Sequence, residues 1–161
     1  MTKPQTTLTW GVKQSFRNYV QSMGGVTEAG GGAERTADGE FTFAVAPGSD
    51  LSLDADGKPQ GQAAFLGEVR FAAHGGMLSV FFADPALEFG PGSAILTVAD
   101  TEARTVRVEI AKLDLTAITT GNDGEMVIPA ALSMYGGQLL GDHYPPMTPL
   151  DPVRLMLPTH G

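Results

Sequence analysis

The chain has 161 residues, enough for one domain with a buried core, and its 42% hydrophobic and 17% charged residues are typical of a folded protein. Its formal net charge is −8, and its ten Lys and Arg residues are scattered, which argues against a nucleic-acid or anionic-membrane partner. The chain contains no cysteine, which excludes disulfides, thiolate metal sites and cysteine nucleophiles.

No apolar run reaches the roughly 18 residues that a membrane-spanning helix needs, so no membrane span is expected. The opening segment, Met1–Thr7, lacks the apolar core of a signal peptide. If the printed sequence is the whole native chain, we expect it in the cytoplasm. If a leader has been removed, we expect it outside the cell or on its surface.

The first predicted element is a helix over Leu8–Met23. Its apolar residues recur mostly at spacings of three and four, which places them on one stripe of a helix with a period of about 3.6 residues: Leu8, Val12, Phe16, Tyr19, Val20 and Met23. Gly24 and Gly25 are typical of a helix end. The glycine-rich stretch from Gly24 to Gly39 is predicted to be a loop.

The rest of the chain is predicted to be almost wholly strand, with apolar residues alternating in short segments. These segments are Glu40–Ala46, Gln62–His74, Met77–Ala83, Ala86–Phe89, Ile95–Ala99, Arg104–Ala111, Glu125–Tyr135 and Val153–Leu157. Within Arg104–Ala111 we expect Val106, Val108 and Ile110 to face inward.

Between these segments lie three predicted turns or loops. His74-Gly75-Gly76 predicts a tight hairpin turn, because paired glycines tolerate positive φ, and Asp84-Pro85 predicts an interruption. The proline-rich segment Tyr144–Pro152 is predicted to be a loop. With no internal repeat and no long linker, residues 1–161 are expected to form one mainly β domain, an antiparallel β-sandwich or barrel with one N-terminal helix.

Candidate site residues are few, and each also has an ordinary structural interpretation. Ser15 and Tyr19 stand four residues apart and share a helix face, but a tyrosine in an apolar stripe is most often core packing. His74 opens the Gly-Gly turn, and His143 and Tyr144 form an aromatic pair that could stack on a flat ligand or anchor a loop. No calcium loop, nucleophile elbow, zinc motif or phosphate loop is present.

Four segments, in order, resemble the HtaA-type haem-binding domains of Gram-positive haem uptake. They are Trp10-Gly-Val-Lys-Gln-Ser-Phe-Arg-Asn-Tyr19, Gly67-Glu-Val-Arg-Phe-Ala-Ala-His-Gly-Gly-Met-Leu78, Phe82-Ala-Asp-Pro85 and Leu150-Asp-Pro-Val153. The resemblance extends from about Leu8 to Leu157. It implies a β-sandwich in which a short helix contributes the haem ligand.

The resemblance also implies roles for particular residues. Tyr19 would be the axial ligand of ferric haem b, His74 would hydrogen-bond the ligand tyrosine, and Ser15 would contact a propionate. His143 and Tyr144 would be the aromatic pair of the site. Phe16 is expected to help cover the porphyrin. The spacing of Arg17, and not the resemblance, makes it an alternative to Ser15 as the contact of a propionate.

The chemistry of phenolate agrees with these implied roles. Phenolate is a hard anionic oxygen donor that favours Fe(III), as tyrosine ligation does in catalase. Free phenols ionise only near pH 10, so such ligation depends on the ferric charge and on a donor such as an imidazole.

Three functions remain open at this point. The first is a haem carrier or scavenger that hands haem to other haem-binding or transport proteins, and it is not an enzyme. The second is a peroxidase-like haem enzyme. The third is a non-haem β-sandwich module for protein interaction, in which Tyr19 and His74 are only structural.

Overall fold

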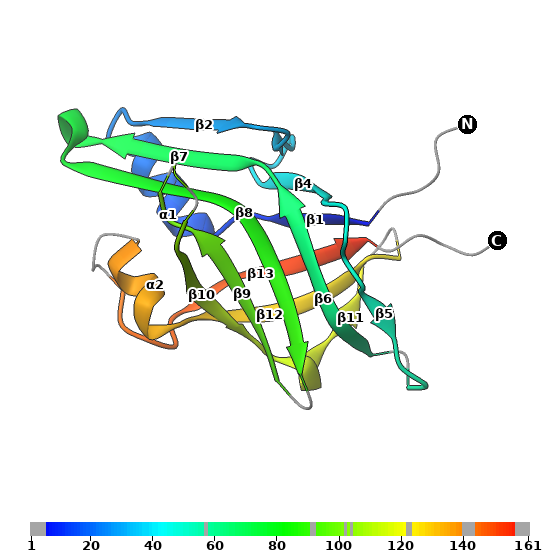
Figure 1. The fold of residues 1–161 in the computed structure, drawn as a ribbon. Helices are drawn as coiled ribbons and strands as arrows, with labels where there is room; N and C mark the ends of the chain where they lie inside the picture. Colours follow the sequence, from blue (N-terminus) through cyan, green and yellow to red (C-terminus); the bar gives the residue numbers. More distant parts are fainter. Residues whose placement is uncertain are drawn as a thin grey trace.

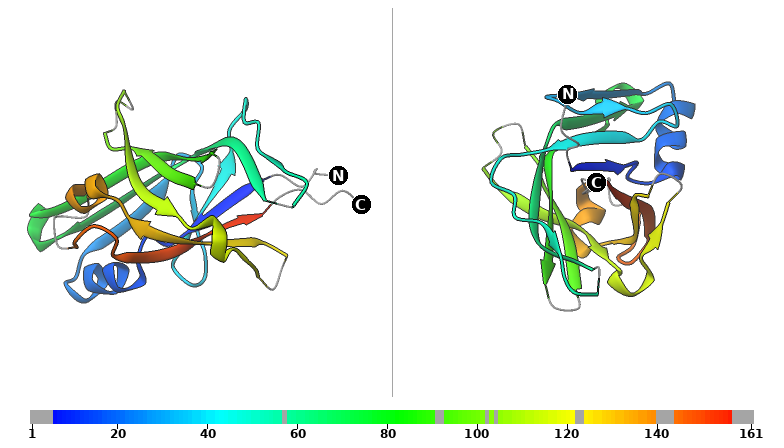
Figure 2. Two further views of the ribbon diagram at one scale, coloured as in Figure 1. Left: turned by 90° about the horizontal axis from the view of Figure 1, so that it is seen from below. Right: turned by 90° about the vertical axis from the view of Figure 1, so that its right-hand side faces the viewer.

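The computed structural model describes residues 6–56, 58–90, 93–101, 103, 105–121, 124–139 and 144–156, with the backbone alone at positions 74, 135, 138 and 139. In this part of the chain, eight antiparallel strands close into a barrel. Their order around it is β8 (Leu78–Gly90), β9 (Ser93–Ala99), β10 (Arg107–Leu113), β12 (Met126–Leu132), β13 (Pro149–Met156), β1 (Thr7–Trp10), β4 (Phe41–Val45) and β6 (Pro59–Leu66), which pairs with β8 again (Figures 1 and 2). The expectation of a mainly β antiparallel fold is confirmed.

Shorter elements extend the barrel or cover it. They are helix α1 (Gln14–Ser22), strands β2 (Val26–Gly30), β3 (Glu34–Arg35), β5 (Ser52–Leu53), β7 (Glu68–Ala73) and β11 (Thr119–Thr120), helix α2 (Met134–Leu139), and the single 3₁₀ turns η1 (His74–Gly76) and η2 (Leu115–Ala117). Strand β7 pairs with β8, and β2 pairs with the outer edge of β7. No helix of the described residues is long and apolar enough to cross a membrane.

The long strand β8 closes the barrel because two strands share one of its edges. Its first half pairs with β7, from Leu78 opposite Ala73, and its second half pairs with β6, from Ala86 opposite Ala64. A register shift between Ala83 and Ala86 separates the halves, and Asp84 has a φ of 49° there. The predicted interruption at Asp84-Pro85 is therefore a β-bulge inside one strand.

Gly67 divides what was predicted as one strand over Gln62–His74 into β6 and β7. Its φ is 143°, and a Cβ atom at this position would lie 2.6 Å from the Cβ of Ala33. A residue with a side chain would be both strained and too close, so the sharp change of direction requires glycine.

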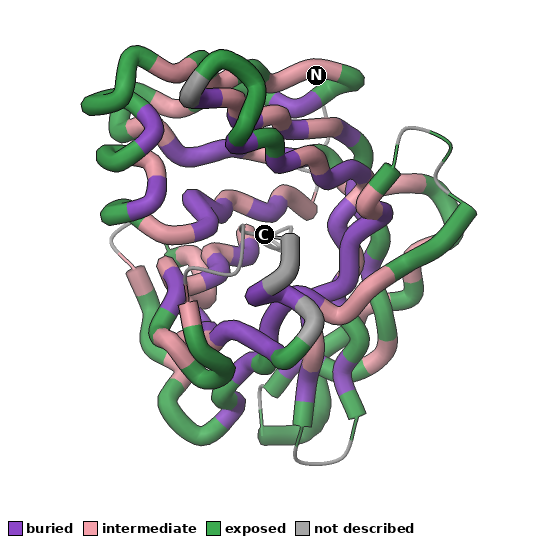
Figure 3. Tube along the Cα trace, turned by 90° about the vertical axis from the view of Figure 1, so that its left-hand side faces the viewer, coloured by how far each residue is buried: buried purple, intermediate pink, exposed green. Residues whose placement is uncertain are grey.

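The interior of the barrel is filled by alternating side chains, as strand geometry requires. The largest fully buried side chains of the described residues come mostly from the barrel strands, with Phe16 added from α1 and Phe71 from β7: Trp10, Phe16, Phe41, Phe43, Phe65, Phe71, Phe82, Leu8, Leu87, Leu96, Ile110 and Ile128. In Figure 3 the buried segments line the interior, whereas exposed residues gather at the outer turns.

Several predicted boundaries were wrong. Leu8–Trp10 is strand β1, paired with β4 and β13, and the helix begins only at Gln14. The predicted loop over Gly24–Gly39 contains β2 and β3. Val106 is 57% exposed because β10 begins only after it.

Two more corrections concern the last third of the chain. The strand predicted over Glu125–Tyr135 ends at Leu132, and helix α2 follows. Strand β13 begins at Pro149, inside the predicted loop, and its first residues pair with β12.

Candidate functional site

Helix α1 presents three different faces, which its sequence pattern determines. Two side chains pack into the core, four line a polar groove of about 240 Å³, and three point outward. The core side chains are Phe16 and Val20, the groove side chains are Gln14, Arg17, Asn18 and Gln21, and the outward side chains are Ser15, Tyr19 and Ser22. Each set has the spacings of three and four that place residues on one helix face.

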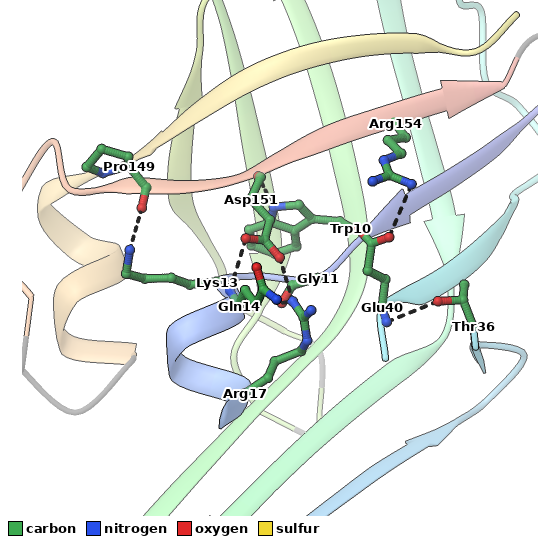
Figure 4. A network of polar contacts seen from close by, with 10 residues as sticks. All are labelled: Trp10, Gly11, Lys13, Gln14, Arg17, Thr36, Glu40, Pro149, Asp151 and Arg154. Carbon is green, nitrogen blue, oxygen red and sulfur yellow. Dashed lines mark hydrogen bonds and ion pairs between the residues drawn. The ribbon is translucent and has the colours of Figure 1, made fainter. Parts of the chain in front are cut away.

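The N-terminal end of α1 is held by a distant residue, Asp151 of β13 (Figure 4). Its Oδ1 accepts a hydrogen bond from the backbone N–H of Gln14 at 2.9 Å, and its Oδ2 accepts one from Arg17 Nη1 at 2.5 Å. Its backbone oxygen accepts a bond from Trp10 Nε1 at 2.8 Å, and its N–H donates to the Val12 oxygen at 2.9 Å. The first and last of the quoted sequence motifs are therefore joined in space.

The C-terminal end of α1 lies against the end of β7. The N–H of Gly25 donates to the Val20 oxygen at 2.8 Å, and a Cβ atom on Gly25 would lie 2.5 Å from the Ala72 oxygen. Ala72 is two residues before His74. This close approach brings the backbone of the His74 turn to the helix end that carries Tyr19.

Tyr19 lies on the outward face, where it is 37% exposed. Ser15 is also exposed, one helical turn earlier. Large apolar side chains nearby in the chain are exposed as well, with Met23 at 46% and Val26 at 52%. The interpretation of Tyr19 as a fully buried core residue does not fit this exposure.

Phe16 and Tyr144 pack against each other next to this face. Their rings meet edge to face at 6.4 Å, and the Phe16 ring also meets Phe71 at 5.1 Å. Lys13 Nζ lies 5.7 Å from the centre of the Tyr144 ring. Phe16 is only 1% exposed, so its ring offers no open surface to a ligand in this conformation.

The remaining predicted site residues can be placed only in part. His74 opens the 3₁₀ turn η1 between β7 and β8, which confirms the predicted turn, with Gly75 at a φ of 65°. Its side chain and the whole of His143 lie outside the described residues. The described residues therefore place Ser15 and Tyr19 on the outward face of α1, Tyr144 against Phe16, and the end of β7 that leads to His74 against the C-terminal end of the helix.

Arg17 is on a different face of α1 from Ser15 and Tyr19. It is bound to Asp151 and also donates to the Gly11 oxygen at 2.7 Å, and its side chain is 13% exposed. This placement argues against the contact with a propionate that spacing alone had indicated.

Sequence reasoning did not identify Asp151 and Trp10 as the residues that hold the helix. Both residues stand in the quoted motifs, but they lie 141 residues apart along the chain. The available signal was an Asp-Pro step next to a strand, which by itself indicates only a turn.

The comparisons with known proteins agree with this architecture. The C-terminal domain of HtaA from Corynebacterium glutamicum is 26% identical, with 95% of each chain covered and a TM-score of 0.73. The N-terminal domain of the same HtaA is 23% identical, with both chains fully covered and a TM-score of 0.72. The heme binding protein HtaB from Corynebacterium glutamicum is 22% identical, with 94% of this chain and 92% of that chain covered and a TM-score of 0.66.

No sequence among the curated proteins matches the chain significantly. The model of the HtaA family (Htaa) matches residues 5–156, which is nearly the whole length. The matched range includes all four of the motifs quoted above. The chain therefore belongs to the HtaA family.

Proposed function

We propose that residues 1–161 form one haem-binding domain that carries ferric haem b, with the phenolate of Tyr19 as the axial ligand. Membership of the HtaA family and the likeness to the heme binding protein HtaB support haem binding and a role in haem uptake. The observation that carries the ligand assignment is the position of Tyr19, half-exposed on a helix whose other faces are taken up by the core and by a polar groove.

The residues at this end of the molecule fit a flat, largely apolar ligand. Tyr19 supplies a hard oxygen donor, and exposed apolar side chains follow it in Met23 and Val26. Met77, immediately after the His74 turn, is 91% exposed. Exposed methionines adapt readily to an apolar surface, so they can cover part of a porphyrin.

Each of the proposed site residues would have its own role in binding haem. Tyr19 would hold the iron, and the imidazole of His74 would donate a hydrogen bond that keeps the phenol oxygen anionic. Ser15 would meet a propionate at the rim, and His143 and Tyr144 would be the aromatic pair of the site. Bound haem would supply a ferric ion that favours an anionic oxygen ligand.

We propose a carrier rather than an enzyme. The HtaB relative is described as a binding protein, and the ligand tyrosine lies on an exposed surface, from which a partner can take the haem. Transfer of haem to apo-myoglobin should be rapid, and peroxide turnover should not exceed that of haem in solution. Peroxide turnover well above that level would favour the enzyme instead.

Haemin titration of the whole chain, followed by absorption spectroscopy, tests the ligand assignment. Wild type should show a Soret band and the charge-transfer absorption of ferric phenolate. Tyr19→Phe should weaken binding by more than about 100-fold, because loss of a ligand exceeds the effect of losing an outer hydrogen-bond partner. Tyr144→Phe, the matched loss of a phenol hydroxyl, should keep the spectrum of ferric phenolate. An unchanged affinity and spectrum in Tyr19→Phe would contradict the assignment.

A further inference from the structure

All four polar groups of Asp151 are hydrogen-bonded to residues 10–17, which lead into α1 and form its first turn. Its two carboxylate oxygens accept bonds from Gln14 and Arg17, and its backbone bonds to Trp10 and Val12. Its side chain is 19% exposed. One residue of β13 therefore contacts both the segment that leads into α1 and the first turn of the helix.

Helix α1 needs such support because it is short and has no cap of its own. It spans nine residues, and the side chain of its N-cap residue, Lys13, makes no capping hydrogen bond. Isolated helices of this length are marginal in water, and their first N–H groups are left without partners. The Asp151 carboxylate supplies both the missing acceptor and a negative charge at the positive end of the helix dipole.

The apolar contacts of α1 do not replace this support. Phe16 and Val20 hold the helix on the barrel, but packed apolar side chains specify direction less strictly than hydrogen bonds, whose strength depends on angle. A binding group must be held within about 0.5 Å of its working position by the residues around it. Tyr19 is on the second turn of α1, so movement of the first turn is transmitted to it.

We propose that Asp151 is a positioning residue for the haem ligand, which fixes α1 so that Tyr19 is presented to the iron in one geometry. This inference rests on the proposed function, since it requires Tyr19 to be the ligand. Without the carboxylate, the protein keeps its barrel, but α1 frays at its first turn and haem leaves faster.

The chain offers a matched control in a second ion pair. Arg154 is on β13, and its Nη1 lies 3.3 Å from Oε1 of Glu40, the residue immediately before β4. Glu40 is 5% exposed. This pair adjoins the Arg17–Asp151 pair, since side chains of both pairs line one polar cavity (Figure 4). Glu40→Gln removes one negative charge, as Asp151→Asn does. Among the described residues, however, neither Glu40 nor Arg154 forms a hydrogen bond with α1.

The experiment compares Asp151→Asn with Glu40→Gln in the whole chain. Asp151→Asn keeps one acceptor oxygen but loses the negative charge at the helix start and the charge-assisted bond from Arg17. In the haem-free proteins, hydrogen exchange should therefore be faster at the first-turn amides of α1 in Asp151→Asn, and unchanged there in Glu40→Gln. With haem bound, transfer to excess apo-myoglobin should be about tenfold faster for Asp151→Asn than for wild type. This is the lower end of the effect usually seen when a residue that supports a metal ligand is lost. The ferric-phenolate absorption of Asp151→Asn should also shift. Glu40→Gln should transfer haem at the wild-type rate.

Two further variants separate the possible failures. In a Tyr19→Phe background, Asp151→Asn should not speed haem loss any further, because no ligand remains to be positioned. If Asp151→Asn does not fold, Arg17→Gln offers a second variant: it breaks the ion pair with Asp151 and the bond to the Gly11 oxygen but leaves the bond from Gln14 to Asp151. It should show the same changes at smaller size.

The results distinguish the inference from the proposed function. If Tyr19→Phe retains haem, the ligand assignment fails, whatever Asp151 does. If Tyr19→Phe loses haem, but Asp151→Asn releases it no faster than Glu40→Gln does, the positioning role is overturned. Unchanged exchange in α1 of Asp151→Asn would overturn it as well.

Discussion

The two ends of the barrel differ in what they expose. At one end, on the left in Figure 1, lie α1, the η1 turn and α2. At the other lie β5, the end of β8, the start of β9 and η2. This second end has a hollow of about 450 Å³, lined by Asp54, Lys58, Pro59, Gln60, Phe89, Gly90, Leu115 and Thr116, which is nearly twice the volume of the groove beside α1.

The polar groups of the second end are engaged in local structure. Asp54 accepts bonds from the N–H groups of Asp56 and Lys58, both at 2.9 Å. Asp114 caps η2 by accepting bonds from Thr116, and these bonds lower the pKa of its carboxyl. The larger hollow is not the candidate site, because the carboxylate of Asp54 in its lining serves a turn, whereas the helical end exposes a tyrosine on an anchored helix.

The largest change in haem retention after loss of Tyr19 itself is expected for His74→Ala. Loss of an imidazole that supports a metal ligand typically costs about 10- to 100-fold in affinity. The variant should still take up haem, but with an altered ferric-phenolate band and faster transfer to apo-myoglobin. A spectrum and transfer rate equal to those of wild type would remove the histidine from the site.

A smaller change is expected for Gly25→Ala, which probes the contact of α1 with β7. The new Cβ atom would lie 2.5 Å from the Ala72 oxygen, so the helix end must move away from the His74 turn. Overpacking of this kind destabilises proteins by about 1–3 kcal/mol, and haem loss should become several-fold faster. Chemical unfolding and haem transfer measure the two effects, and wild-type values in both would show that the contact is not required.

A modest effect is expected for Tyr144→Ala. Its ring packs on Phe16, and aromatic pairs contribute about 0.5–1.5 kcal/mol beyond their buried area. Haem affinity, measured by titration, should fall by a few-fold, with the ferric-phenolate band retained. An unchanged haem affinity would mean that Tyr144 does not contact the haem.

The smallest effect on haem is expected for Leu115→Ala at the opposite end. This residue is buried, and truncation of a buried leucine destabilises by about 2–5 kcal/mol. The unfolding midpoint should fall, while haem transfer at a temperature where the protein stays folded should match wild type. Faster haem loss here would break the comparison between the two ends, because general loosening of the barrel would then explain the effects of Gly25→Ala.

Much of the fold was predictable because alternation is a local property. The strands over Glu40–Ala46 and Ile95–Ala99 lie close to β4 and β9, and His74-Gly75-Gly76 forms the expected turn. The segment Leu8–Trp10 was assigned wrongly because its apolar residues suit a helix stripe as well as a strand. Pairing with Phe41–Ala44 and with Arg154–Met156 decided in favour of the strand, and neither partner is near in sequence.

The sequence by itself determined the family resemblance, the mainly β class and the chemical identity of the proposed ligand, because these depend on residue types and short spacings. Only the tertiary structure decided where the ligand helix begins and what holds it. Asp151 is 137 residues from Gln14, and contacts over such distances leave no periodic signal in the chain. The first turn of α1 thus meets a carboxylate that comes close to it only when β1 and β13 pair.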